Sequence, residues 1–153
     1  MAEPLKYEDL IAKIERLFAQ TKFATLAYIK SGVPHTAQMC LISDGLDVYM
    51  QTDAKFDKTA AIRENPNVAI NIGAFNFTGC AEIAGHPSES SWYINAIKEK
   101  HPDTHLQYTN LPDEVLLKIT LTNAKIWGKV EGQECLRLID FSNKTIKKIA
   151  VEC

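Results

Sequence analysis

The sequence predicts an α+β protein with a small, mostly antiparallel β-barrel, an N-terminal helix and two connecting helices. Three observations predict it: an amphipathic helical segment at the start, short strand-like runs separated by tight turns, and two further helical segments between such runs. Strands of this length also fit a sandwich, and periodicity leaves that alternative open. With 153 residues, no internal repeat and no linker-like tract, residues 1–153 are expected to form one domain.

The first half of the chain predicts a helix and then a meander. Residues 7–20 carry apolar side chains at helical spacing. Strands are expected next at 23–30, 33–42 and 46–52, where tight turns at Ser31-Gly32 and Ser43-Asp44-Gly45 favour antiparallel pairing.

The remaining elements follow from the same two periodicities. In chain order they are a helix over 54–65, strands at 68–74 and 77–85, a helix over 88–100, and strands at 116–131, 136–141 and 145–151. Gly79 and Gly85 predict a bulge or a close backbone approach in their strand. The polar, irregular segment 101–114 is expected at the rim of a pocket.

Composition excludes several classes of protein. Hydrophobic residues make up 46% and charged residues 24% of the chain, and the net charge is −2. This balance favours a soluble globular protein without a nucleic-acid or anionic membrane partner. There is no apolar run of about 20 residues and no signal-like apolar core near the start, so a cytoplasmic protein is expected. The four cysteines form no CxxC pair and are expected to be reduced thiols: Cys40, Cys80, Cys135 and Cys153.

One stretch, TDAKFDKTAAIRENPNVAI (52–70), carries a candidate anion site. Thr52 ends a predicted strand, and Lys58 and Thr59 lie near the start of the next predicted helix. A helix N-terminus offers unpaired N–H groups and partial positive charge, which suit a phosphate. There is no Gly-rich phosphate loop, so an ordinary strand–helix–strand connection with a solvated Lys58 remains the alternative.

Other candidate chemistry is weaker. His101 and His105 have ligand spacing, but Pro102 argues against a shared helix face and no carboxylate or Cys set lies nearby, so no metal site is expected. The serines at 88–91 lack a nucleophile elbow and are better explained as helix caps, so no catalytic residue is assigned. Trp127 either covers a ligand ring or fills a core or interface.

The order of motifs resembles a known family. FATLAYIKSGVPHTAQMCLI, GLDVYMQTDAKFDKTAAIRENPNVAINI and FTGCAEIAGHP, within residues 21–87, are similar to the pyridoxamine 5′-phosphate oxidase-like FMN-binding split barrels. The resemblance implies a split barrel, a homodimer, and FMN at the subunit interface. It implies that one strand runs along the flavin ring, at Gln38, Met39, Cys40 and Leu41. A strand end and the following helix would face the phosphate, at Gln51, Thr52, Lys58 and Thr59. A late strand would close the site at Trp127.

The chain departs from the family pattern near the phosphate. Ala37-Gln38 occupies a strand that often holds an Arg, and Asp57 stands where a basic residue often precedes the Lys. A lost positive and a gained negative charge are expected to weaken phosphate binding. The chain also lacks the basic, Arg- and His-containing C-terminal element that holds the substrate's phosphate in the family, and reads KKIAVEC there, so pyridoxamine 5′-phosphate is not the expected substrate.

The expected function is an FMN-dependent oxidoreductase that passes electrons from a reduced donor, such as a nicotinamide, to an unknown acceptor. Two alternatives stay open: a non-catalytic flavin-binding or stress-associated protein, and a haem-binding relative with His35 or His86 as axial ligand.

Overall fold

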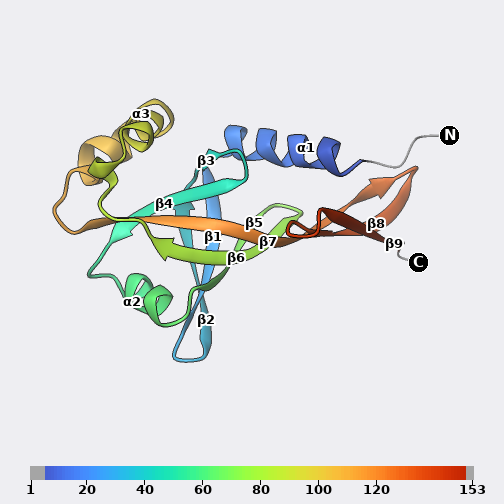
Figure 1. The fold of residues 1–153 in the computed structure, drawn as a ribbon, viewed down its shortest axis with the longest axis horizontal. Coiled ribbons are helices and arrows are strands. Elements are labelled where there is room, and N and C mark those ends of the chain that lie inside the picture. Colours follow the sequence, from blue (N-terminus) through green and yellow to red (C-terminus); the bar gives the residue numbers. More distant parts are fainter. Residues whose placement is uncertain (1–5, 151–153) are drawn as a thin grey trace.

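The fold is built on one long antiparallel sheet that curls into an open barrel (Figure 1). The computed structural model describes residues 6–150. Seven strands are neighbours in the order β2-β1-β5-β6-β7-β4-β3, and β8 and β9 continue from β7 as an arm that extends away from the barrel. Their bounds are β1 Phe23–Lys30, β2 Val33–Cys40, β3 Ile42–Asp44, β4 Asp47–Asp53, β5 Asn67–Ile72, β6 Phe75–Ile83, β7 Glu114–Val130, β8 Gln133–Asp140 and β9 Thr145–Ala150.

Helices cover the sheet at three places (Figure 1). Their bounds are α1 Tyr7–Gln20, α2 Asp57–Glu64, η1 Pro87–Glu89, α3 Ser91–Lys100, α4 Pro102–Thr104 and η2 His105–Thr109. The predicted α+β architecture, with an N-terminal helix and two connecting helices, is confirmed. Cys153 and the last residue of the strand predicted at 145–151 lie outside the described residues.

Helix α1 has the bounds that its periodicity predicts, 7–20. Leu10, Ile14 and Phe18 are fully buried against the barrel, and the Phe18 ring lies 5.1 Å from that of Phe77 on β6. The helix ends at Gln20. Thr21 follows with an extended backbone, and its hydroxyl donates to the Leu17 carbonyl at 2.6 Å. Burial of this one apolar face accounts for most of the helix's stability.

The hairpin of β1 and β2 forms as predicted. Ser31 and Gly32 both have positive φ, 51° and 75°, which is the type I′ geometry that matches the twist of two antiparallel strands. The predicted three-stranded meander is wrong, however, because β4 pairs with β7 and not with β2. The strand predicted over 33–42 ends at Cys40, where the Leu41 N–H donates to the Lys22 carbonyl and the chain turns into the separate β3–β4 hairpin.

Gly79 marks a close backbone approach, as predicted. The pairing of β6 with β7 shifts register between Thr78 and Gly79, which is a β-bulge. A Cβ atom at Gly79 would lie 2.5 Å from the Thr120 carbonyl oxygen, so no other residue fits without a backbone shift.

The two connecting helices are shorter than predicted. Residues 53–56 form a turn, so α2 begins only at Asp57. The segment predicted as one helix over 88–100 is divided into η1 and α3, and Ser90 caps α3 by accepting from the Tyr93 N–H. The segment 101–114, expected to be irregular, begins with the short helices α4 and η2.

No helix among residues 6–150 combines the length and the hydropathy that crossing a bilayer requires.

Candidate functional site

An open cavity of about 230 Å³ lies where the end of β4 meets the start of α2. We call it the Lys58 pocket. Its walls come from β2, the β4–α2 segment, the short helices before β7, and the first residue of β7. The lining residues are Gln38, Met39, Cys40, Gln51, Thr52, Asp53, Phe56, Lys58, Thr104, Tyr108 and Glu114.

Six of the nine residues that the sequence proposes for a cofactor line this pocket. They are Gln38, Met39, Cys40, Gln51, Thr52 and Lys58. Segments far apart in the sequence are brought together because β2 and the end of β4 lie near each other although they do not pair.

The other three proposed residues lie elsewhere in this chain. Leu41 is fully buried in the barrel core. Thr59 is also fully buried, and its hydroxyl donates to the Asp53 carbonyl at 2.9 Å, which fixes the start of α2. Trp127 lies at the opposite end of β7 from Glu114 and is 45% exposed.

Lys58 is the cation of the pocket. Its ammonium group lies 4.9 Å from the centre of the Phe56 ring, and the residue is half-buried. Two neighbouring lysines form ion pairs, Lys30 with Asp57 and Lys55 with Asp113, whereas within residues 6–150 Lys58 forms none. Burial lowers the pKa of Lys58 because desolvation penalises the charged form. A bound anion would supply the charge partner that the ammonium group lacks.

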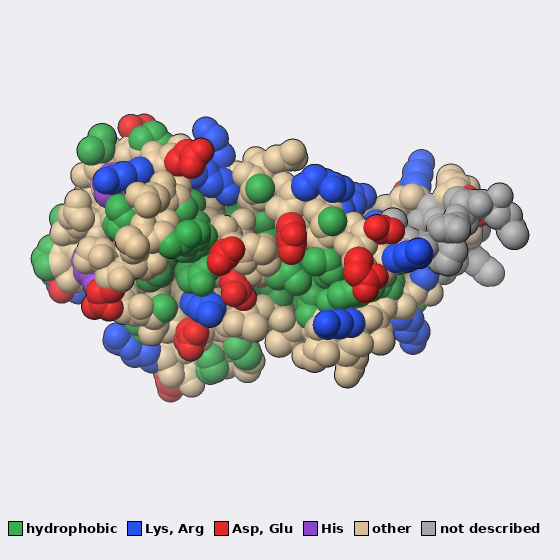
Figure 2. Space-filling view, turned by 45° about the horizontal axis from the view of Figure 1, so that its top comes forward, with side chains coloured by type: hydrophobic (Ala, Val, Ile, Leu, Met, Phe, Trp, Pro, Cys, Tyr) green, Lys and Arg blue, Asp and Glu red, His purple; other side chains and the backbone are tan. Residues whose placement is uncertain are grey.

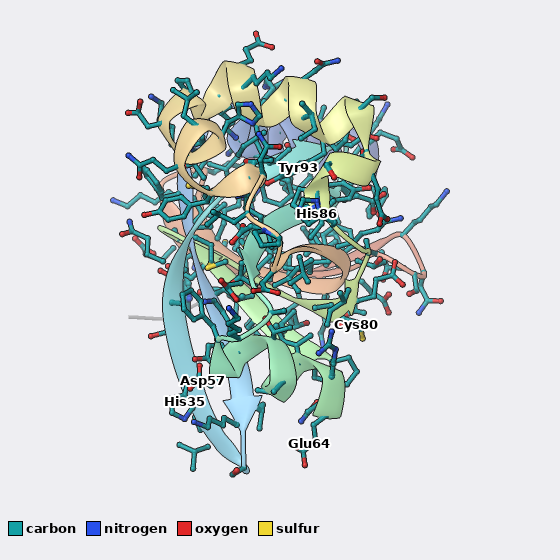
Figure 3. All side chains as sticks on the ribbon, turned by 90° about the vertical axis from the view of Figure 1, so that its left-hand side faces the viewer. His35, Asp57, Glu64, Cys80, His86 and Tyr93 are labelled. Carbon is teal, nitrogen blue, oxygen red and sulfur yellow. The ribbon has the colours of Figure 1, made fainter. Side chains whose placement is uncertain are left out.

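Asp57 does not line the pocket, although it precedes Lys58 in the sequence. Its carboxylate accepts from Lys30 Nζ at 3.0 Å and from the Tyr28 hydroxyl at 3.4 Å. The Lys30 hydrogen bond holds the pKa of Asp57 below its usual value. Figure 3 shows Asp57 beside His35 of the β1–β2 hairpin. The charge that the sequence places next to Lys58 is therefore balanced by Lys30.

Two polar side chains in the pocket have no protein partner within the described part of the chain. Thr52 is 5% exposed, and its hydroxyl makes no hydrogen bond to residues 6–150. The exposed Gln38 amide likewise makes none within that range. These groups are available to hydrogen-bond a polar ligand.

Gln51, in contrast, is held by the protein at both its oxygen and its nitrogen. Its carbonyl oxygen accepts from the Tyr93 hydroxyl at 2.8 Å and from the Thr109 hydroxyl at 3.1 Å. Its amide nitrogen donates to Glu114 Oε2 at 3.0 Å. Gln51 therefore joins β4, α3, η2 and β7 beneath the pocket.

Five lining residues were not singled out from the sequence: Asp53, Phe56, Thr104, Tyr108 and Glu114. Three of them belong to the segment 101–114, which the sequence predicts at the pocket rim. The segment's polar composition gave that signal, but no spacing within it distinguishes Glu114 from its neighbours.

The histidines lie outside this pocket. His35 stacks on Tyr28 with ring centres 5.6 Å apart. Both ring nitrogens of His86 are engaged, with Nδ1 accepting from the Ser88 N–H and Nε2 2.7 Å from the Leu111 carbonyl oxygen. In the view of Figure 3, His35 lies near the bottom of the molecule and His86 in its upper half. Among residues 6–150, no three metal-ligating side chains come together.

A second hollow, of about 280 Å³, lies on the outer face of the sheet. Small and polar side chains from neighbouring strands form it, and one cross-strand row runs Gln38, Thr25, Asn71, Asn76 and Lys125. On β2, Thr36 lines this hollow and Gln38, two residues further along, lines the Lys58 pocket, so the two hollows lie next to each other. On the face of the molecule drawn in Figure 2, charges of both signs are interspersed.

Known proteins share this fold and part of this sequence. General stress protein 26 of Bacillus subtilis is 32% identical over 69 residues, which cover 45% of this chain and 49% of that protein. The match thus spans about half the length of that relative. A pyridoxamine 5′-phosphate oxidase-related, FMN-binding protein from Nostoc punctiforme has a TM-score of 0.63 at 12% identity, covering 99% of both chains. A haem storage protein from Vibrio cholerae has a TM-score of 0.59 at 14% identity, covering 76% of this chain and 91% of that one.

The two structural likenesses are below 25% identity and show the fold alone, a split barrel. The family follows from the sequence. A family model described as pyridoxamine 5′-phosphate oxidase matches residues 10–128, which include every residue that lines the Lys58 pocket. The chain belongs to the pyridoxamine 5′-phosphate oxidase-like family.

Proposed function

We propose that the Lys58 pocket binds FMN by its phosphate and that the protein is a small oxidoreductase, which passes electrons from a reduced donor to an acceptor. One observation carries the proposal. A half-buried lysine without an ion-pair partner in residues 6–150 shares a pocket with the uncommitted hydroxyl of Thr52. FMN binding by the Nostoc relative agrees with this reading.

Each part of FMN has a complementary group in the pocket. Lys58 and the first turn of α2 supply positive charge for the phosphate. Thr52 and Gln38 supply hydrogen bonds for the ribityl hydroxyls. The strand residues Met39 and Cys40 lie along one wall, where a flat ring would stack. When bound, the flavin itself supplies the electron and hydride chemistry, so a conspicuous acid–base pair is not required of the protein.

We further propose that the working unit is a homodimer. Pockets that enclose a ligand of this size have volumes of about 300–1,000 Å³, more than the roughly 230 Å³ of the Lys58 pocket. A second copy seated on the adjacent outer sheet hollow would complete the walls, and Trp127, exposed at the far end of β7, would reach the site only from that copy.

Light scattering during size-exclusion chromatography tests the dimer. We expect a mass of twice 17.1 kDa for the FMN-loaded protein. A 17.1 kDa particle that retains one FMN per chain would contradict the dimer proposal and leave the flavin proposal intact.

A flavin reduction experiment tests the function. The protein is mixed with FMN, freed of unbound flavin and titrated anaerobically with NADH or NADPH while the visible flavin absorbance is followed. Retained flavin that is bleached faster than free FMN supports an oxidoreductase with a nicotinamide donor. Retained flavin that neither donor bleaches favours the second candidate, a non-catalytic flavin-binding or stress-associated protein. The partial likeness to general stress protein 26 agrees with the stress-associated description. Loss of all flavin on separation contradicts both candidates.

A further inference from the structure

Glu114 is an unusual residue for a pocket that is to hold an anion. It is the first residue of β7 and lies opposite Asp53, the last residue of β4. Both acidic residues line the Lys58 pocket, and Glu114 is only 5% exposed. The single cation of the pocket, Lys58, therefore faces two carboxyl groups, one of them almost entirely removed from solvent.

A hydrogen bond from the Gln51 amide fixes the position of the Glu114 carboxyl group. The Gln51 carbonyl already accepts from Tyr93 and Thr109, so the amide cannot flip without losing two hydrogen bonds. Its nitrogen must therefore donate to Glu114 Oε2. Within residues 6–150 nothing donates to the other carboxyl oxygen, Oε1. This oxygen is the part of Glu114 left for a ligand.

The groups around Glu114 give it little charge compensation. Asp53 on β4 disfavours its ionised form, whereas Lys58 on α2 and His86 before η1 favour it. Burial raises the pKa of the Tyr93 phenol on α3, and the negative charge of Glu114 raises it too. Tyr93 therefore remains neutral. The residue immediately before Glu114, Asp113, is already paired with Lys55 at 2.7 Å.

The balance of these effects shifts Glu114 toward its protonated form, compared with a solvent-exposed glutamate. Burial raises the pKa of Glu114, and the Gln51 hydrogen bond opposes this only in part. A carboxylate is an acceptor only, but its protonated form can donate one hydrogen bond to a phosphate oxygen. An anion bound at Lys58 would raise the pKa of Glu114 further, because like charges disfavour each other's ionisation.

We infer that Glu114 makes phosphate binding in the Lys58 pocket depend on pH: its protonated carboxyl group admits the anion, and its carboxylate repels it. The inference rests on the proposed function, since it takes the FMN phosphate as the anion at Lys58. It identifies Glu114 as the residue that sets the pH range in which the pocket accepts its ligand.

The sign of the effect follows from proton counting. The bound state holds the Glu114 proton more firmly than the free state does, so binding takes up protons and affinity falls as pH rises through the Glu114 pKa. The phosphate has an opposite effect. Its second pKa is near 6, and Lys58 prefers the dianion, so this group alone would make affinity rise with pH.

The test compares FMN affinity of the wild type and Glu114→Gln from pH 5 to pH 8, by quenching of flavin fluorescence. Gln keeps the shape and an oxygen that accepts from Gln51, but it cannot ionise. We expect the advantage of Glu114→Gln to grow as pH rises from 5 to 8 and to reach about tenfold, the order expected when one nearby like charge is removed. Asp53→Asn is the matched control, because Asp53 lines the same pocket but is less buried and more screened by solvent. It should change the pH dependence less.

Proton uptake on FMN binding gives a readout that does not depend on the variant's stability. Calorimetry in two buffers of different ionisation enthalpy measures the number of protons taken up on binding. For the wild type, this number per FMN should exceed the number that ionisation of the FMN phosphate alone would give. Parallel pH profiles for wild type and Glu114→Gln, or weaker binding by the variant at every pH, would overturn the role of Glu114. If Lys58→Ala still lowers FMN affinity in that case, the proposed function stands; if it does not, both fail.

Discussion

Replacing Gln51 with Leu should destabilise the protein by about 3 kcal/mol or more. Leu has a similar size, but it leaves the hydroxyls of Tyr93 and Thr109 and the Glu114 carboxyl group without their partner. Each buried polar group left unsatisfied costs about 1–3 kcal/mol. For a chain of this length, that loss corresponds to a fall in Tm of roughly 6–12 °C.

Gln38→Leu is the control for this experiment. It is the same chemical change in the same pocket, but Gln38 is exposed and makes no hydrogen bond to residues 6–150. Its effect on the free energy of unfolding should stay within about 0.5 kcal/mol. Urea unfolding of both variants at one protein concentration measures the difference. Equal stabilities would show that the Gln51 network does not hold β4, α3 and β7 together.

Replacing Lys58 with Ala should weaken FMN binding about tenfold to a hundredfold. A hydrogen bond to a charged group contributes about 1.5–3 kcal/mol, and each 1.4 kcal/mol is a factor of ten in affinity. Lys58 forms no ion pair within the described residues, so its removal breaks no salt bridge. Fold stability should therefore change little, and the loss should appear in ligand binding alone.

Lys55→Ala is the matched control for Lys58→Ala. Lys55 lies three residues earlier, is exposed, and pairs with Asp113 instead of lining the pocket. Its removal changes the net charge by the same amount but should alter FMN affinity less than twofold at moderate salt, because exposed charges are screened. An equal loss in the two lysine variants would mean that general charge, and not the pocket, attracts the ligand.

Local patterns predicted local structure well. The apolar spacing of Leu10, Ile14 and Phe18 predicted α1 to the residue, and Ser31-Gly32 predicted the hairpin, because both signals depend on neighbours in the chain. The pairing of β4 with β7 joins segments about 65 residues apart, and no local pattern encodes it. The meander prediction therefore failed where the chain leaves β2 at Leu41.

The candidate site was predictable to the same extent. Lys58 and Thr52 lie on one continuous stretch whose strand-to-helix order is readable in the sequence. The role of Gln51 was not readable, because its partners Tyr93, Thr109 and Glu114 come from distant elements. Nor did the sequence show that Lys30 pairs with Asp57, which removes one of the two reasons to expect a weakened phosphate site. The other reason, Gln38 in place of an Arg, is unaffected.

The central claim is that Lys58 recognises the FMN phosphate, and a thermodynamic cycle tests it most directly. FMN and riboflavin, which lacks only the phosphate, are each titrated into the wild type and Lys58→Ala, with flavin fluorescence as the signal. We expect FMN to bind the wild type at least tenfold tighter than riboflavin does, and this preference to disappear largely in Lys58→Ala. Equal affinities of the wild type for FMN and riboflavin, or a preference that Lys58→Ala retains in full, would contradict the central claim.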